Sequence, residues 1–178
     1  MKAYPFITAI IIFSLSGGCQ KSASKSVKTE IYFFDLKTFF NTEASRLMLA
    51  NKPIYKTVYV KNVPEKKLIK ITNWASELSL FSQSDINKTA FKNSYRIKST
   101  ANKIVYTAKV SDVKTRSILI YLEQKKPVSI TIINHQKNYI FETWETLYYA
   151  TNTKYSIKKK QKLLFWDTDE YKIFGNFN

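Results

Sequence analysis

Few residues in this sequence carry side chains that could act directly on a substrate. The 178-residue chain contains one cysteine, Cys19, and one histidine, His135. Nucleophilic and metal sites draw several such groups together, and a lone histidine in a predicted turn (134–138) is more typical of a surface position. Glu142 and Glu145 are close in sequence but fall on opposite faces if their segment is a strand. We therefore predict no catalytic set, no metal site and no cofactor.

Two further kinds of site are disfavoured by composition and spacing. Asp167, Asp169 and Glu170 offer oxygen ligands in a predicted turn, but their spacing does not match a calcium-binding loop. Aspartates in turns usually accept hydrogen bonds from their own backbone. After residue 18 the only glycine is Gly175, so the chain has neither a phosphate-cradling loop nor a dinucleotide-binding fingerprint.

The context of Cys19 is more informative than its chemistry alone. Lys2 precedes a short apolar run (7–15), and the small residues Ser16-Gly17-Gly18 lead directly into Cys19. This is the layout of a cleaved export signal, and the run is shorter than the roughly 20 apolar residues that span a bilayer. It resembles the lipobox read by lipoprotein signal peptidase, which implies removal of residues 1–18 and acylation of Cys19. The usual leucine of that motif is displaced by one position, to Leu15, and an ordinary secretory peptide followed by a cysteine is the alternative.

The residues after the cysteine bear on location. Residues 20–29 are small, polar and basic, which predicts a flexible tether over 19–29. Several acyl chains on one cysteine would make the attachment stable. Gln20 replaces the aspartate of the common inner-membrane retention signal, and no acidic run typical of surface export follows. Both features favour the periplasmic face of the outer membrane, with residues 30–178 forming one globular domain.

The chain is strongly basic, with a formal net charge of +16, or +15 once Lys2 is removed with the signal. Such a balance attracts polyanions and acidic lipid headgroups. An exported protein meets little nucleic acid, so we expect an acidic lipid or polysaccharide, or an envelope protein, as partner. Lysines spread along strands can instead serve only to keep sheet edges soluble. The densest basic cluster is a candidate polyanion contact in a predicted hairpin turn: Lys158, Lys159, Lys160 and Lys162.

Hydrophobic periodicity predicts two helices. Asp35 is a candidate N-cap for a helix over 36–50, whose apolar residues recur at helical spacing and which ends before Pro53. Asn73 caps a second predicted helix over 73–82, with Trp74, Leu78 and Phe81 on one stripe.

The rest of the chain alternates like strands separated by polar turns. The predicted strands are 54–61, 68–71, 95–98, 103–110, 116–122, 128–133, 139–141, 154–157, 162–166 and 171–177, with a turn at 62–65 and a further region from 142 through 149 before the next turn. No alternating strand–helix pattern is present, which disfavours a parallel sheet. We predict an α+β fold: an antiparallel meander forming a curved sheet or half-barrel, with both helices packed on one face. The 12 tyrosines, 12 phenylalanines and three tryptophans either pack this core or line an apolar groove for a lipid or peptide.

The second predicted helix carries a resemblance to known proteins. Residues 73–81 read Asn-Trp-Ala-Ser-Glu-Leu-Ser-Leu-Phe, and residues 85–88 read Asp-Ile-Asn-Lys. Together with 32–37 and 171–175, these segments resemble a family of small uncharacterised lipoproteins from Bacteroidetes-type bacteria, a resemblance that implies no known activity. If a polar cluster in this region is functional, the candidates are Glu77, Asp85, Asn87 and Lys88, although capping and backbone hydrogen bonds also account for them.

These observations predict an envelope lipoprotein that is not an enzyme and that binds a partner. The first alternative is a half-barrel that binds or carries lipid, favoured by a covered sheet rich in aromatic rings. The second alternative is a hydrolase with an unfamiliar site built from carboxylates.

Overall fold

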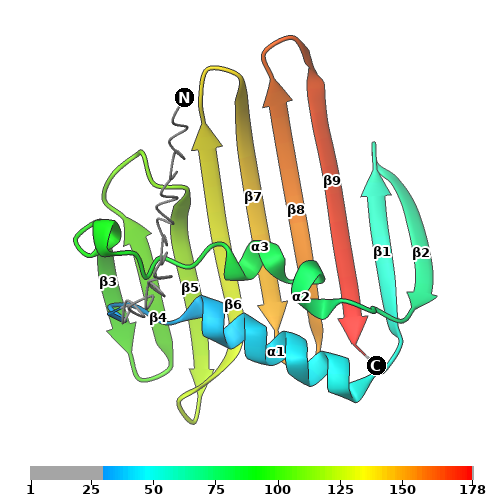
Figure 1. Ribbon diagram of the computed structural model, residues 1–178, viewed down its shortest axis with the longest axis horizontal. Coiled ribbons are helices and arrows are strands. Elements are labelled where there is room, and N and C mark those ends of the chain that lie inside the picture. The colour runs from blue at the N-terminus through cyan, green and yellow to red at the C-terminus, as the bar shows by residue number, and fades with distance from the viewer. Residues whose placement is uncertain (1–29, 178) are drawn as a thin grey trace, which may run out of the picture.

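The protein folds around one open, nine-stranded antiparallel sheet, which a computed structural model describes over residues 30–177. The helices are α1 (Leu36–Ala50), α2 (Trp74–Glu77), α3 (Ser79–Ser82) and the short 3-10 helix η1 (Thr89–Phe91). The strands are β1 (Ile54–Val60), β2 (Val63–Ile69), β3 (Tyr95–Thr100), β4 (Lys103–Ala108), β5 (Thr115–Glu123), β6 (Lys126–Lys137), β7 (Phe141–Ala150), β8 (Lys154–Leu163) and β9 (Trp166–Phe177). The α+β class, with a curved sheet and helices on one face, is confirmed (Figure 1). Cys19, the predicted signal and the predicted tether lie outside the described residues.

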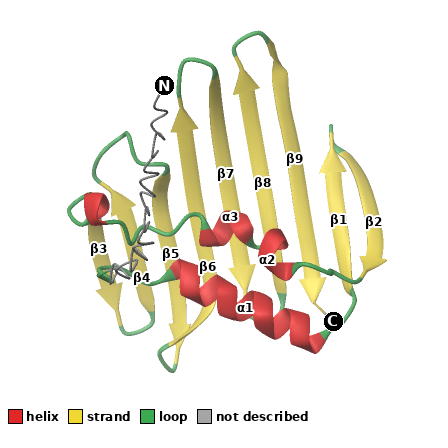
Figure 2. Ribbon diagram, in the orientation of Figure 1, coloured by secondary structure: helices red, strands yellow, loops and turns green. Residues whose placement is uncertain are grey.

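The strand order shows how the chain covers its own sheet. The order is β2-β1-β9-β8-β7-β6-β5-β4-β3, so the β1–β2 hairpin forms one edge and β3 the other. Between them the chain crosses the sheet through α2, α3 and η1, and then winds back strand by strand until β9 pairs with β1 (Figure 1). All helices therefore lie over one face, here called the helix face, and the opposite face is called the outer face (Figure 2).

Helix α1 has the bounds that its sequence predicts. The Asp35 carboxylate accepts a hydrogen bond from the Thr38 N–H at 2.8 Å, which satisfies a backbone donor at the helix N-terminus. Asn51 ends the helix in the left-handed conformation, with φ at 50°. The buried residues Leu36, Phe40, Ala44 and Leu47 recur every three or four positions and face the sheet. Within residues 30–177 no helix is long and apolar enough to cross a membrane.

The second predicted helix is divided into two. Asn73 caps α2 as predicted, accepting from the Ser76 N–H at 2.9 Å, but Leu78 leaves the helical conformation and separates α2 from α3. The hydroxyls of Ser82 and Ser84 donate to backbone carbonyls three and four residues earlier, which competes with regular helix formation. The apolar stripe is nevertheless buried, since Trp74, Leu78 and Phe81 all pack into the core.

Aromatic rings fill the space between the helices and the sheet. The ring of Phe40 on α1 lies 4.8 Å from that of Phe81 on α3 and 5.3 Å from that of Tyr149 on β7. The ring of Trp74 lies 5.9 Å from that of Phe177. Burying each large apolar side chain stabilises a fold by about 1.5–3 kcal/mol. These rings therefore hold the helix layer on the sheet.

The hairpin connections differ from those expected on sequence grounds. The predicted turns at 134–138 and 158–162 are wrong, because residues 134–137 continue strand β6 and residues 158–162 continue strand β8. The chain turns instead at Asn138–Ile140 and at Leu164–Phe165. Asp169 and Glu170, expected in a turn, lie within β9. Both faces are polar in these segments, because the outer face is open to solvent and the helix face there is not covered by helices.

The first hairpin also turns earlier than expected. The turn is formed by Lys61 and Asn62, both with positive φ (50° and 65°), and Val63–Glu65 already pair with β1. Residues with positive φ at both central positions match the twist of a two-residue hairpin. Pro64 is accommodated because β2 is an edge strand.

Candidate functional site

Two rows of polar side chains cross the helix face beyond the edge of the helix layer. Strand register places Asn134, Glu145, Lys159 and Tyr171 side by side on β6, β7, β8 and β9. The next row consists of Gln136, Thr143, Gln161 and Asp169. On the other side, toward the helices, the corresponding row is Ile132, Leu147, Ile157 and Ile173. The helix face therefore changes from apolar to polar over two residues along each strand.

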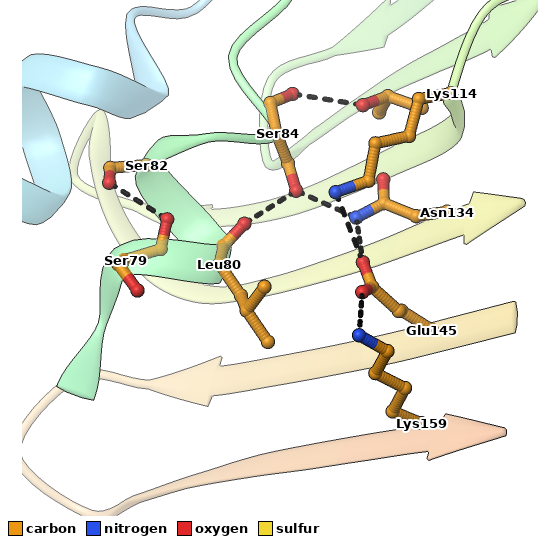
Figure 3. Close-up of polar contacts among 9 residues, drawn as sticks. Ser79, Leu80, Ser82, Ser84, Lys114, Asn134, Glu145 and Lys159 are labelled. Atoms are coloured by element: carbon orange, nitrogen blue, oxygen red, sulfur yellow. Dashed lines mark hydrogen bonds and ion pairs between the residues drawn. The ribbon is translucent and has the colours of Figure 1, made fainter. Parts of the chain in front are cut away.

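Glu145 is the charged centre of these rows. Its side chain is only 4% exposed and accepts a hydrogen bond from the Asn134 amide at 3.1 Å. The ammonium of Lys114 lies 3.3 Å from one carboxylate oxygen, and that of Lys159 lies 3.6 Å from the other (Figure 3). A buried carboxylate needs such partners, since an unpaired buried charge is strongly destabilising. Two ammonium groups facing one carboxylate leave the cluster with one net positive charge.

The amide of Asn134 is held in one orientation. Its nitrogen donates to Ser84 Oγ at 2.8 Å as well as to Glu145, and Ser84 Oγ in turn donates to the Leu80 carbonyl at 2.7 Å (Figure 3). Turning the amide over would place an oxygen against the Glu145 carboxylate, which can only accept. With this orientation fixed, Asn134 Oδ1 is buried and has no hydrogen-bond donor among the described residues.

This cluster lines a cavity of about 260 Å³ at the edge of α3. Its lining also includes the Gln136 and Gln161 amides, Thr143, and the apolar side chains of Leu80 and Phe141. We call this cavity and its lining residues the polar groove. A second cavity of about 460 Å³ lies on the other side of Leu80, lined in part by Ile71, Ile157, Tyr171 and Ile173. Burial, reinforced by the charge of Glu145, raises the pKa of the Tyr171 hydroxyl above its ordinary value.

The four residues proposed from the 73–88 segment do not meet in one place. Asp85, Asn87 and Lys88 line one cavity of about 720 Å³, whereas Glu77 lines the cavity beside Ile71. Asn87 Oδ1 accepts from the backbone N–H groups of Tyr32 and Phe33, at 3.0 and 2.9 Å. These bonds fix the segment that leads into α1.

The other members of that set also have local partners. Asp85 accepts from the Asn87 N–H at 2.8 Å, and the Lys88 ammonium lies 5.4 Å from the centre of the Phe91 ring. Glu77 accepts from the Tyr155 hydroxyl and from the Lys56 ammonium. These contacts are all within the protein and join its segments to one another.

The basic cluster expected in a turn is divided between the two faces of the sheet. Lys158, Lys160 and Lys162 lie on the outer face of β8, whereas Lys159 alone lies on the helix face and reaches Glu145. His135, expected in a turn, lies on the outer face of β6, stacked on Trp144 with 5.5 Å between ring centres. Its Nε2 lies 2.8 Å from Glu142 Oε1, and this hydrogen bond, aided by Lys137, lowers the pKa of that carboxyl.

Sequence reasoning did not find the polar groove. The sequence pattern predicts Asn134 in a turn and relates Glu145 only to Glu142, which does lie on the opposite face as predicted. The available signal was the continuation of period-2 alternation past the last apolar residue, as in Ile130, Ile132, Asn134 and Gln136. Without the register between strands, nothing in the sequence joins this series to Glu145 or Lys159.

Comparison of the chain with protein-family models, with curated proteins and with solved structures finds no match. The resemblance of residues 73–88 to a lipoprotein family therefore stays a prediction.

Proposed function

We propose that this protein is an envelope lipoprotein that binds an acidic saccharide in the polar groove and does not transform it. In this proposal a lipid on Cys19 holds the protein on the periplasmic face of the outer membrane. The observation that carries the binding role is Asn134 Oδ1, a buried acceptor fixed in place, without a donor among the described residues, beside two lysines. A buried polar atom left unsatisfied costs about 1–3 kcal/mol, and a ligand that donates to it recovers that cost.

The chemistry of the lining selects the kind of ligand. A sugar hydroxyl that reaches Asn134 Oδ1 can donate to it, while a carboxylate or sulfate on the same sugar can pair with Lys114 or Lys159. The amides of Gln136 and Gln161 can each donate to and accept from further hydroxyls. A ligand with hydroxyls and one negative charge therefore complements this lining.

The carboxylates are arranged for binding rather than for hydrolysis. Glycoside hydrolysis uses two carboxylates about 5–9.5 Å apart across the scissile bond. In the polar groove Glu145 is the one lining carboxylate among the described residues, and it is already paired with two lysines. Asp169 lies two strands and one row away, a backbone separation of roughly 12 Å from strand spacing and rise.

A second candidate function, lipid binding, is favoured by the cavity beside Ile71. Its wall includes Ile71, Leu80, Ile157 and Ile173, which would suit an acyl chain. The polar groove is the stronger candidate, because its fixed amide and lysines give it directional contacts that an acyl chain would not use.

Calorimetric titration tests the saccharide proposal. Purified full-length protein in detergent micelles is titrated with trigalacturonic acid as the acidic probe and with maltotriose as the neutral probe of equal length. We expect binding of the acidic probe only. Replacing Lys159 by Gln or Asn134 by Ala should weaken binding about tenfold each, the equivalent of one good polar contact of about 1.4 kcal/mol.

Lys158→Gln is the matched control. It removes the same charge one residue away, but from the outer face of the same strand. The proposal requires that Lys158→Gln binds like the wild type. Equal weakening by Lys158→Gln and Lys159→Gln, equal binding of maltotriose, or no binding of trigalacturonic acid would each overturn it. Urea unfolding of every variant separates loss of binding from loss of fold.

A further inference from the structure

Two neighbouring hairpin tips present large apolar side chains to solvent. Tyr139 is 98% exposed, Phe165 81% and Trp166 71%. Ile140 and Leu164 beside them are also exposed. We call these five residues the tip patch. Both hairpins project from the sheet at the end opposite α1 (Figure 1).

The two hairpin tips that carry the tip patch are joined to each other by a backbone hydrogen bond. The Leu164 N–H donates to the Ile140 carbonyl at 3.0 Å, which joins the β8–β9 tip to the β6–β7 tip. Asn138 Oδ1 accepts from the N–H groups of Ile140 and Phe141, both at 2.8 Å, which closes the β6–β7 turn. The two tips that carry the five apolar side chains are therefore held next to one another.

Exposing a large apolar patch to water is energetically unfavourable. Contiguous exposed apolar surface of this kind marks an interaction site in a soluble domain. Its composition is that of the membrane interface, where tryptophan and tyrosine gather at the level of the lipid headgroups and phenylalanine and leucine reach the acyl chains.

The charge beside the tip patch is complementary to an anionic bilayer. On the outer face of β6, β8 and β9, approaching the tips, lie five lysines: Lys137, Lys158, Lys160, Lys162 and Lys172. Two carboxylates, Glu142 and Glu170, lie among them. Each lysine near an anionic membrane surface contributes to attraction that falls off within a Debye length.

The chain outside the structure limits where such a bilayer can be. Ten residues, 20–29, separate Cys19 from the first described residue, Glu30. At full extension they reach roughly 35 Å. If Cys19 carries the proposed lipid, this short tether keeps the folded part close to the same membrane, which raises the effective concentration of the tip patch there.

We infer that the tip patch inserts into the headgroup region of a bilayer, as a second membrane contact in addition to the proposed anchor. Trp166, Phe165 and Tyr139 enter the interface, and the outer-face lysines meet anionic headgroups. Docking in this way also places the polar groove near the membrane, since Glu145 lies five residues, or about 17 Å of strand, from the β6–β7 tip.

Fluorescence quenching by brominated lipids tests this inference. The full chain is reconstituted with phosphatidylcholine–phosphatidylglycerol vesicles that contain brominated phosphatidylcholine. The protein has three tryptophans, of which Trp74 is buried in the core. Trp144→Phe keeps Trp166 as the exposed reporter, and Trp166→Phe keeps Trp144. We expect quenching at least about twofold greater in Trp144→Phe, because only that variant has an indole at the tip patch.

A further pair of variants, made in the Trp144→Phe background, separates the tip patch from the anchor. Leu164→Ser with Phe165→Ser should abolish the excess quenching, even though the N-terminus still holds the protein on the vesicle. Val63→Ser, in the exposed β1–β2 hairpin at the edge of the sheet, is the control and should leave quenching unchanged.

Equal quenching of the two tryptophan variants, or none in either, would overturn the inference. So would a Phe165-dependent dimer in sedimentation velocity without vesicles, since a second copy would then cover the patch. None of these readouts depends on saccharide binding, so failure here and failure of the proposed function are distinguishable.

Discussion

Replacing Gly175 by Ala should destabilise the fold severely, because an aromatic ring occupies the space of the missing side chain. Gly175 on β9 pairs directly with Tyr155 on β8. A Cβ at Gly175 would lie 1.9 Å from Tyr155 Cε1 and 2.4 Å from Cζ. Ordinary carbon contacts are about 3.5–4.0 Å. The ring cannot move aside freely, because it is 1% exposed, packs on Trp74 and Phe177, and donates its hydroxyl to Glu77.

The size of the effect follows from these contacts. Forcing an extra methyl group into a packed core costs about 1–3 kcal/mol. If the ring is displaced, the hydrogen bond from Tyr155 to the Glu77 carboxylate is also lost, and bonds to charged groups contribute about 1.5–3 kcal/mol. We expect Gly175→Ala to lower the free energy of unfolding by about 3–5 kcal/mol, a large share of the roughly 5–15 kcal/mol typical of a domain.

Urea unfolding followed by far-UV circular dichroism measures this change. Asn176→Ala, at the exposed neighbouring position, is the control and should alter the free energy of unfolding by less than about 0.5 kcal/mol. In a Tyr155→Leu background the smaller side chain makes room, and Gly175→Ala should then cost less than about 1 kcal/mol. A small cost in the wild type, or an unchanged cost in the Tyr155→Leu background, would show that the ring does not set the limit.

Three other changes test single contacts. Glu43 is buried, which pushes its pKa up, but hydrogen bonds from Arg46 and Tyr149 outweigh burial and lower that pKa. The contribution of Glu43 to the stability of the fold is therefore present at neutral pH and is lost as pH falls through the folded-state pKa. The difference in unfolding free energy between wild type and Glu43→Gln should shrink between about pH 6 and pH 3, and a constant difference would contradict this assignment. Asp35→Ala should lower the unfolding free energy by about 1 kcal/mol, while Asp35→Asn, which can still cap α1, should not; urea midpoints at unchanged slope measure both. Asn87→Ala should cost about 2–3 kcal/mol and speed hydrogen exchange of the Tyr32 and Phe33 amides, and slow exchange there would refute its role as their acceptor.

Local signals in the sequence are sufficient to predict some of the helices and their caps. The bounds of α1 are as predicted, because Asp35 caps its start and the apolar spacing continues without interruption to Ala50. The cap at Asn73 and the buried stripe of Trp74, Leu78 and Phe81 are also confirmed. Each of these features depends on contacts within a few residues along the chain.

Hairpin turns were harder to predict, for a physical reason. Polar runs such as 134–138 and 158–162 look like turns when a strand is assumed to be half-buried along its whole length. In this fold β6 and β8 extend past the helix layer, so their inward side chains become polar without leaving the sheet. The true tips at Tyr139–Ile140 and Leu164–Phe165 are apolar, which is the opposite of the usual turn composition.

The sequence by itself determined the fold class, the caps and the core stripe of the helices. It also predicts an export signal before the lone cysteine, Cys19. Only the tertiary structure brought Asn134, Glu145 and Lys159 into one row, separated Lys159 from its neighbouring lysines, and joined two apolar tips into one surface. The reason is the distance along the chain over which each signal acts. Caps and periodicity act over a few residues, whereas the row and the tip patch depend on register between strands, and one residue of slip would move each side chain to the other face.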